Sequence, residues 1–456
     1  MIRFTKITAS IGPNCEDKTT LTKMIKAGVN VCRLNFSHDT GEVQGAKIDI
    51  IRNISQELKI PVAVMVDVQG PKHRIGNFET ENHYPLKIGQ KFILDSDPTP
   101  GNETRVFLPD EDVMKSLNIG DRVLLNDGKI ELKVDSVFDD KIETTVVRGD
   151  EIWSRRGFNL PDTDINTEIL TAKDKADLEY AITKNPDYVA LSFVQRAEDI
   201  EFVRDFINAR TSHPIKIIAK IERPNAVERI IDIANAADAI MIARGDLAVE
   251  LPFEQVPAVS RQIIRECRKL NRPVIMATQM LSSMVHSEFP TRAEISDVAN
   301  AAYLRTDSAM TSEETTIGDN PVNVIATMDK ILSYSDSDAI ENPYDWSRID
   351  NIPENDWSRS VSSMAYLNKA VAIVVFARDT DTTIQIACRR PDIPIIAVCG
   401  QDYVANQLNL VRGVFPVCDS YLFGQRDAFN SVRQFGIGIG KLVIVDDDKI
   451  SLRTMD

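Results

Sequence analysis

IKIIAKIERPNAVERIIDIANAADAIMIARGDLAVE, residues 215–250, contains two apolar runs, 215–222 and 239–247. Apolar residues between the runs recur at helical spacing, so the stretch predicts a strand–helix–strand unit of an α/β protein. The first run ends with Lys220 and Glu222, and the second ends near Asp246. Burying a charge on a strand that is covered on both faces is costly unless the charge lines a site. We therefore expect a ligand site at the carboxyl ends of these strands.

Strand and helix patterns alternate on both sides of this unit. Before it, helices are expected at 18–27, with Asn14 as the candidate N-cap, and at 41–58. The expected strands cover about 5–11, 30–36, 61–67, 188–193, 216–222, 239–247, 273–279 and 307–314. Eight strands, each followed by a helix, predict a closed (β/α)8 TIM barrel, and the alternative is an open doubly wound sheet.

Polar side chains near the ends of the predicted strands favour the barrel. A barrel gathers the carboxyl ends of all its strands at one mouth, whereas an open sheet spreads them along an edge. The side chains that one mouth would collect are Arg33, Asn35, Asp67, Ser192, Lys220, Glu222, Asp246, Thr278, Ser312 and Glu314.

Two further units interrupt and follow the barrel pattern. Apolar residues alternate with period two in DRVLLNDGKIELKVDSV and KIETTVVRG, which predicts an inserted antiparallel β module. Beyond about Ser333, the polar stretch SDSDAIENPYDWSRIDNIPEND predicts a linker, and the apolar runs AIVVFA, IPIIAVC and KLVIVDD predict a small α/β domain. The expected domains are the barrel at 1–75 and 162–340, the inserted β-barrel module at 76–161 and the C-terminal domain at 341–456.

Composition narrows the class of protein. The 456 residues are 43% hydrophobic and 27% charged, as expected of a globular chain with several cores. The formal charge of −15 and the lack of a long basic run argue against nucleic acid as a partner. The six cysteines show no CxxC pairing, which argues against a zinc cluster or a disulfide scaffold. Neither a signal core nor a membrane-length apolar run is found, so we expect a cytoplasmic protein.

The residues at the predicted mouth suit phosphoryl transfer. Glu222 and Asp246 are hard oxygen ligands for Mg²⁺ or Mn²⁺, and Lys220 lies on the same strand face as Glu222. Arg33 offers a planar fork for phosphate or carboxylate. Each feature alone has a simpler explanation, because Lys-x-Glu is usually a surface ion pair, Arg33 could extend to solvent and Asp67 could cap a loop. Only their coincidence at one mouth indicates chemistry.

Ten segments together resemble a known family. They are TKITASIGP, NVCRLNFSH, DVQGPKHRIG, NDGKIEL, RRGFNLP, LSFV, IIAKIE, MIARGDLAVE, ATQML and PTRAEISDVANA. From Thr5 to about Leu332 the chain resembles the pyruvate kinase family, with these segments in that family's order, and the resemblance continues more weakly to the C-terminus. It implies a (β/α)8 A domain, an inserted β-barrel B domain that closes as a lid, an α/β C domain and a homotetramer.

The resemblance also implies roles for individual residues. Glu222 and Asp246 would hold the divalent metal, Lys220 would neutralise the phosphoryl group in transit, and Arg33 would anchor that group. The backbone of Ala243 and Gly245 would contact the carboxylate of phosphoenolpyruvate, while Thr278 would help protonate the enolate. The nucleotide-binding residues would be Arg74, Arg156, Asn35 and His38, with a second Mg²⁺ on the nucleotide.

A monovalent-cation site is implied as well, formed by Asn35, Ser37 and Asp67. Family members with lysine in the DxQGPK segment manage without K⁺, and this chain has Lys72 there, so K⁺ is not expected to be required. A lysine ammonium can supply the charge that the ion would otherwise provide.

Several positions depart from the family pattern. Asp39, Asp162, Ala248 and Glu313 replace glycines, and Arg156 replaces a lysine. Glu313 is the most suspect, since it adds bulk and negative charge near the mouth. The expected function is a glycolytic pyruvate kinase that converts phosphoenolpyruvate and ADP to pyruvate and ATP. The alternatives are a catalytically weakened paralogue with a regulatory or binding role, and a metal-dependent pyruvate or oxaloacetate lyase.

Overall fold

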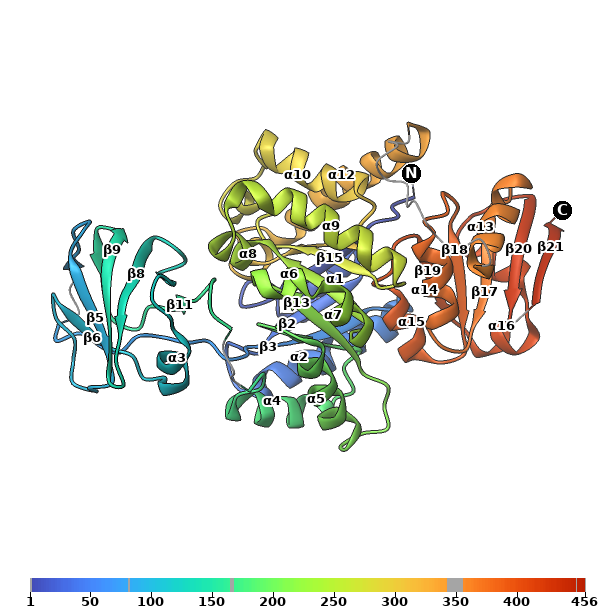
Figure 1. Cartoon of the computed structure of the whole chain (residues 1–456). Helices are drawn as coiled ribbons and strands as arrows, with labels where there is room; N and C mark the ends of the chain where they lie inside the picture. The colour runs from blue at the N-terminus through green and yellow to red at the C-terminus, as the bar shows by residue number, and fades with distance from the viewer. Residues whose placement is uncertain (1, 81–82, 165–167, 343–355, 448, 456) are drawn as a thin grey trace.

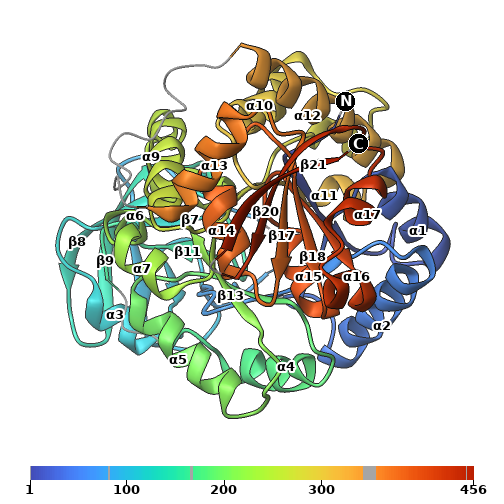
Figure 2. The ribbon, with the colours of Figure 1, turned by 90° about the vertical axis from the view of Figure 1, so that its right-hand side faces the viewer.

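The computed structural model of the chain describes residues 2–80, 83–164, 168–342, 356–447 and 449–455. Figure 1 shows the barrel in the middle, the inserted module on one side and the C-terminal unit on the other. In Figure 2 the C-terminal unit faces the viewer, and the barrel helices surround it from behind.

The central unit is a closed barrel of eight parallel strands in the order β1-β16-β15-β14-β13-β12-β3-β2. Strand β1 pairs with both β2 and β16, so the sheet has no free edge and the open-sheet alternative is wrong. The strands are β1 (Lys6–Ile11), β2 (Val31–Asn35), β3 (Ala63–Val68), β12 (Tyr188–Leu191), β13 (Lys216–Ile221), β14 (Ala239–Ala243), β15 (Val274–Ala277) and β16 (Ser308–Thr311).

Helices surround this barrel and bury its apolar outer face. They are α1 (Lys18–Ala27), α2 (Gly41–Leu58), α4 (Ala172–Ile182), α5 (Ala197–Asn208), α6 (Pro224–Glu228), α7 (Ile230–Ala236), α8 (Arg244–Glu250), α9 (Val256–Lys269), α10 (Arg292–Tyr303), α11 (Glu313–Thr316) and α12 (Pro321–Glu341), with the 3-10 turns η1 (Phe253–Gln255) and η2 (Ser282–Val285). In the described parts of the chain, no helix is both long enough and apolar enough to cross a bilayer.

Three sequence predictions about element ends are wrong. Asp17, not Asn14, caps α1, because its carboxylate accepts from the backbone N–H groups of Thr19 and Thr20. Asn14 instead donates to the carbonyls of Ile317 and Gly318, which ties the loop after β1 to the loop after α11. The predicted strands 239–247 and 307–314 end at Ala243 and Thr311, where the chain turns into α8 and towards α11.

The predicted linker also begins later than Ser333, since α12 continues to Glu341. Its last turns look polar in the sequence, but Ser335 and Asp336 are buried against neighbouring segments. Residues 343–355 of the predicted linker lie outside the described residues.

The inserted module follows β3 and returns to the barrel before α4. Six of its strands form one sheet in the order β11-β7-β8-β9-β5-β6, and β10 pairs with β4. The pairing is antiparallel, as the alternation predicts, except for the parallel pair β5–β6. The elements are β4 (Tyr84–Pro85), β5 (Lys91–Asp95), β6 (Arg105–Phe107), α3 (Glu111–Ser116), β7 (Arg122–Leu125), β8 (Ile130–Val137), β9 (Lys141–Arg148), β10 (Glu151–Ile152) and β11 (Phe158–Asn159).

The C-terminal unit is a five-stranded sheet in the order β19-β18-β17-β20-β21, parallel except for the pair β20–β21. Separate apolar clusters cover its two faces, one including Val361 and Val404 and the other Leu422 and Val432. The elements are α13 (Trp357–Leu367), β17 (Ala372–Ala377), α14 (Asp381–Cys388), β18 (Ile395–Cys399), α15 (Asp402–Leu408), β19 (Val414–Cys418), α16 (Ser420–Gln425), α17 (Ala428–Arg433), β20 (Gly440–Asp446) and β21 (Lys449–Met455).

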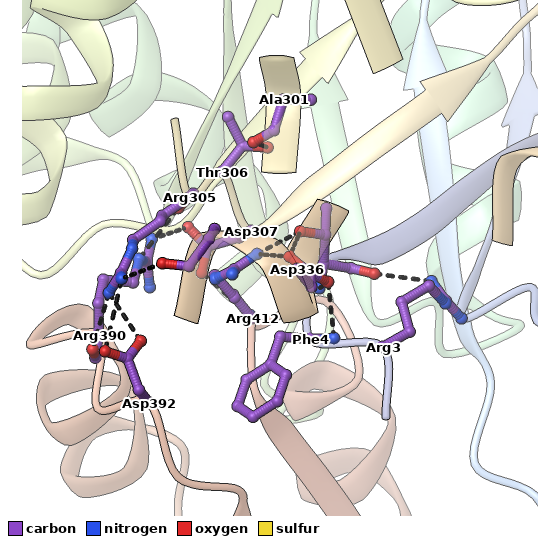
Figure 3. A network of polar contacts seen from close by, with 12 residues as sticks. Arg3, Phe4, Ala301, Arg305, Thr306, Asp307, Asp336, Arg390, Asp392 and Arg412 are labelled. Carbon is purple, nitrogen blue, oxygen red and sulfur yellow. Dashed lines mark hydrogen bonds and ion pairs between the residues drawn. The ribbon is translucent and has the colours of Figure 1, made fainter. Parts of the chain in front are cut away.

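Buried ion pairs fasten the C-terminal unit to the amino end of the barrel (Figure 3). Arg390 and Asp307 are 2.6 Å apart, and Arg412 and Asp336 are also 2.6 Å apart. Asp336 additionally accepts hydrogen bonds from the backbone N–H groups of Phe4 and Thr5, at 2.8 and 2.7 Å. The carboxylates at this end of the barrel are therefore surrounded by donors from the protein itself.

Candidate active site

Four charged side chains and one serine converge at the carboxyl end of the barrel. Lys220 of β13 lies 3.0 Å from Glu222 Oε1 and 3.4 Å from Asp67 Oδ1. Its Nζ also donates to Ser192 Oγ at 2.7 Å. Arg33 of β2 donates from Nε to Asp67 Oδ2 at 2.7 Å. The structure thus brings together side chains from the carboxyl ends of four different strands, β2, β3, β12 and β13, as the sequence predicted.

Burial and mutual attraction set the charges of this cluster. Burial alone would lower the pKa of Lys220, but the carboxylates of Asp67 and Glu222 raise it above its ordinary value. Burial would raise the pKa of Asp67, yet Lys220 and Arg33 hold it below the usual range. Lys220 is therefore a cation at neutral pH, and Asp67 is its fixed counter-charge.

Glu222 and Asp246 fit a divalent metal. Burial raises the pKa of Glu222 to about 7; Lys220 opposes that shift, and the nearby Asp246 carboxylate adds to it. Asp246, in the first turn of α8, makes no hydrogen bond or ion pair with any residue that the structure describes. Across the described ranges, no group of three or more His, Cys, Asp or Glu side chains could hold an ion. The chain thus offers two carboxylates, and other ligands must come from water and substrate.

Thr278 adopts an unusual backbone conformation beside this pair. Its φ is 68°, a left-handed value that is a genuine outlier for a β-branched residue. The strain is held by its neighbours, since Thr278 Oγ1 accepts from Gly245 N at 2.8 Å and Thr278 O accepts from Arg244 at 2.6 Å. The sequence predicted that the Gly245 backbone would contact substrate, but in the structure its N–H is already engaged by Thr278. Ala243 ends β14 next to it.

Two of the three residues implied for the monovalent-cation site, Asn35 and Asp67, make side-chain contacts with the protein. Asn35 Oδ1 accepts from the backbone N–H of Ser37 at 3.1 Å, which shapes the turn after β2. Asp67 is enclosed by Arg33 and Lys220. Lys72 is exposed and lines a small hollow under the inserted module, and Asp246 lines the same hollow.

The implied nucleotide residues lie on two different units. Arg74 and Arg156 line a hollow of about 710 Å³ in the inserted module, together with Arg155. None of these three guanidinium groups forms an ion pair with a carboxylate of the described residues. Arg156 is steadied by Trp153, with its guanidinium carbon 4.8 Å from the ring centroid. His38 lies in the barrel loop after β2, and its backbone carbonyl accepts from Gln44 at 3.1 Å.

The positions that replace family glycines are mostly free of strain. Among them, only Asp39 has a positive φ, at 63°, and aspartate tolerates that conformation. Asp162 pairs with Arg122 at 2.7 Å, and Ala248 is an ordinary residue of α8. Glu313 begins α11 with its side chain exposed to solvent.

Two of the predicted mouth residues serve the fold. Glu314 is buried and accepts from the backbone N–H groups of Ser312 at 2.6 Å and Leu281 at 3.2 Å. It therefore holds the loops after β15 and β16 together, and Ser312 shares in that contact. Ser312 takes part through its backbone N–H and not through its hydroxyl group.

Sequence reasoning missed a cluster in which Arg223 and Glu250 are buried and Gln195 and Asn159 are half-buried. Arg223 directly follows Glu222, but a charged residue before proline predicts a solvent-exposed loop. The signal that could have found it is the pairing of opposite charges at the ends of adjacent elements, Arg223 after β13 and Glu250 at the end of α8.

Two family models match the chain. "Pyruvate kinase, barrel domain" matches residues 2–325, and "Pyruvate kinase, alpha/beta domain" matches residues 355–445. A pyruvate kinase of Methylorubrum extorquens is 39% identical over 422 residues, which cover 91% of this chain and 86% of the relative. One of Thermococcus litoralis is 36% identical over 98% of this chain and 94% of its own. A solved pyruvate kinase structure from Cryptosporidium parvum superposes with a TM-score of 0.92 at 30% identity, covering 100% of this chain and 96% of that one.

Proposed function

This chain belongs to the pyruvate kinase family, and we propose that the barrel mouth transfers the phosphoryl group of phosphoenolpyruvate to ADP, giving pyruvate and ATP. The single observation that supports this best is the buried cation Lys220, held between two carboxylates beside the unpaired Asp246. Phosphoryl transfer depends on positioning and charge neutralisation, and this cluster is arranged for both.

Four residues of the mouth would act directly in this reaction. Glu222 and Asp246 would hold Mg²⁺ or Mn²⁺, which when bound supplies positive charge to the enolate oxygen of the leaving group. Lys220 remains charged and meets the phosphoryl group as it moves. Arg33 anchors the same group through Nη2, which no described residue engages, while Nε and Nη1 are fixed by Asp67 and Ser10.

Thr278 is suited to deliver the proton that converts the enolate to pyruvate. Because Thr278 Oγ1 accepts its hydrogen bond from Gly245 N, the hydroxyl proton is directed elsewhere and remains available for donation. Contact between the substrate carboxylate and the backbone of Ala243 and Gly245 would require this hydrogen bond to be shared.

The inserted module, which we place at 76–161, would act as a lid that carries nucleotide-binding groups. Arg74 and Arg156, unpaired with any described carboxylate, would face the ADP phosphates and their Mg²⁺. Asn35 and His38 would meet the nucleotide from the barrel side. We further propose a homotetramer and a role in glycolysis, both expected from the family resemblance, and a cytoplasmic location, expected from the sequence. Reaction without K⁺ is supported by Asp67, whose charge Arg33 and Lys220 already neutralise.

A pyruvate-release assay with purified protein, phosphoenolpyruvate, ADP and Mg²⁺ tests this function. Pyruvate and ATP formed in equal amounts are expected. Pyruvate formed from oxaloacetate without ADP would indicate a lyase instead. Binding of phosphoenolpyruvate without turnover would indicate the weakened paralogue. Glu313 would then be the first residue to substitute.

A further inference from the structure

Arg223 is buried at the point where the inserted module rejoins the barrel. Only 5% of the residue is exposed, and its guanidinium donates in three directions. Nη2 donates to the carbonyl oxygens of Leu160 and Thr163, at 2.6 and 3.0 Å. Nη1 donates to Gln195 Oε1 at 3.1 Å. These contacts fix the returning chain, residues 159–163, to the end of strand β13.

Glu250 completes the cluster from the other side. Its Oε2 lies 3.3 Å from Arg223 Nε, and its Oε1 accepts from Asn159 Nδ2 at 2.9 Å. Glu250 is the last residue of α8, one turn after Asp246, and it is 3% exposed. Burial raises its pKa, and the positive charge of Arg223 opposes that shift. The returning chain is thus held by both a barrel strand and the helix that carries a metal ligand.

The two connections of the inserted module differ in how they are held. Residues 71–74 of the outgoing chain are exposed or half-buried, whereas Leu160 and Thr163 of the returning chain are buried. A second contact reinforces the returning side, because the turn between β7 and β8 approaches α8 so closely that a Cβ on Gly128 would lie 3.3 Å from Val249. In Figure 1 the module extends away from the barrel beyond β11, so small rotations at this junction move its far end widely.

We propose that Arg223 is a positioning residue that sets the orientation of the inserted module relative to the metal-binding end of the barrel. The planar guanidinium of Arg223 binds four oxygen atoms at fixed angles. A lysine ammonium, which acts as a point charge, cannot hold them in this arrangement. Arg156 lies in the module, and Arg74 of the outgoing chain forms a β-bridge with Gly157 of the module. Arg223 therefore determines where the nucleotide phosphates are received, without touching them. Only the statement about the nucleotide phosphates rests on the proposed function; the orientation of the module does not.

The test compares Arg223→Met with Arg229→Met. Arg229 is the matched control, because it contacts the same returning segment through Asp164 at 3.0 Å, but both partners are largely exposed. Spin labels placed by Asp139→Cys on the module and Arg261→Cys on α9 report the distance between the two units. The labelled chains carry Cys418→Ser, since Cys418 is the exposed cysteine and the other five are buried.

We expect Arg223→Met to broaden the distribution of label distances and to raise the KM for ADP about tenfold, since a buried charged hydrogen bond contributes that much or more. Phosphoenolpyruvate binding with Mg²⁺ but without ADP should change less than about threefold, because it depends on the barrel. Arg223→Lys should be intermediate, and Arg229→Met should match the wild type.

Three outcomes would overturn the proposal: an unchanged distance distribution, an equal loss of affinity for both substrates, or the same broadening in Arg229→Met. If Arg223→Met folds poorly, the double variant Arg223→Met/Glu250→Leu is measured in its place, because it removes the buried carboxylate together with its partner. The distance measurement does not depend on turnover. If the wild type were inactive, broader distances in Arg223→Met than in the wild type would still support the positioning role, while the inactivity would contradict the proposed reaction.

Discussion

The two ends of the barrel both bury charges, but they treat them differently. At the amino end, Asp307 and Asp336 are surrounded by arginine and backbone donors (Figure 3). At the carboxyl end, Lys220 is held tightly while Asp246 and Arg33 Nη2 face no described partner. Where every buried charge has a protein partner, as at the amino end, the cluster holds two domains together. Where some hydrogen-bond donors and acceptors have no described partner, as at the carboxyl end, they can bind a ligand. Burial of charge alone therefore does not mark an active site; the unused donors and acceptors do.

The strongest test of this contrast uses the two lysines of strand β13. Lys220→Met should lower turnover about 10³- to 10⁴-fold, because it removes the charge that meets the moving phosphoryl group. Metal and phosphoenolpyruvate binding should stay largely intact. Lys216→Met, at the amino end of the same strand, is the control and should leave turnover near wild type. Steady-state kinetics with a direct binding measurement checks both, and near-normal turnover of Lys220→Met would contradict its role.

At the amino end the expected effect is on stability rather than on chemistry. Arg390→Met leaves Asp307 buried without its guanidinium partner, so the free energy of unfolding should fall by about 3 kcal/mol. Urea unfolding measures this loss. Arg378→Met breaks the exposed pair with Asp447 and should change stability by less than about 1 kcal/mol. Equal losses in the two variants would show that this interface is not held by its buried pairs.

A smaller effect is expected for the dependence of turnover on K⁺. Wild-type turnover should be nearly the same in tetramethylammonium and potassium buffers of matched ionic strength. Lys72→Glu replaces a positive charge near Asp246 with a negative one, so this variant should need K⁺ and gain about tenfold from it. A large potassium stimulation of the wild type would show that Lys72 does not replace the ion.

The smallest effect concerns pH and the amino end. Burial lowers the pKa of Lys6 from 10.5 to about 7, and its ammonium donates to the carbonyl of Val414 in the C-terminal unit. Between these two pKa values the unfolded chain binds one more proton than the folded chain, so this lysine makes the free energy of unfolding rise with pH. Its contribution should be about 1 kcal/mol per pH unit between pH 7 and 9. Lys6→Met should lose this slope in urea titrations, and an unchanged slope would contradict the assignment.

Much of the fold could be predicted from local patterns in the sequence. Helices α1 and α2 have the predicted bounds, because their apolar spacing is regular and turn residues flank them. Strands β14 and β16 are shorter than predicted, since an apolar run does not show where a glycine or a serine lets the chain turn into a helix. The extension of α12 depends on Asp336 being buried by Arg412, which lies 76 residues away and which no local pattern reveals.

The candidate site shows the same limit. Lys220, Glu222 and Asp67 could be predicted to meet because parallel strands end together. The strained backbone of Thr278, the engagement of Gly245 and the structural role of Glu314 depend on hydrogen bonds between distant loops. Arg223 could not be distinguished from a surface residue, because its burial comes from a module inserted elsewhere in the chain.

The closure of the barrel has a consequence for synthesis on the ribosome. Strand β1 gains its second neighbour only when Lys6 pairs with Ser308, and Phe4 meets Asp336 across 332 residues. At a synthesis rate of about 5–20 residues per second, the nascent β1 waits roughly 15–60 s with one side unpaired. An open strand edge in an unfinished chain invites pairing with other nascent chains. We expect newly made protein to depend on chaperones until α12 has left the ribosome.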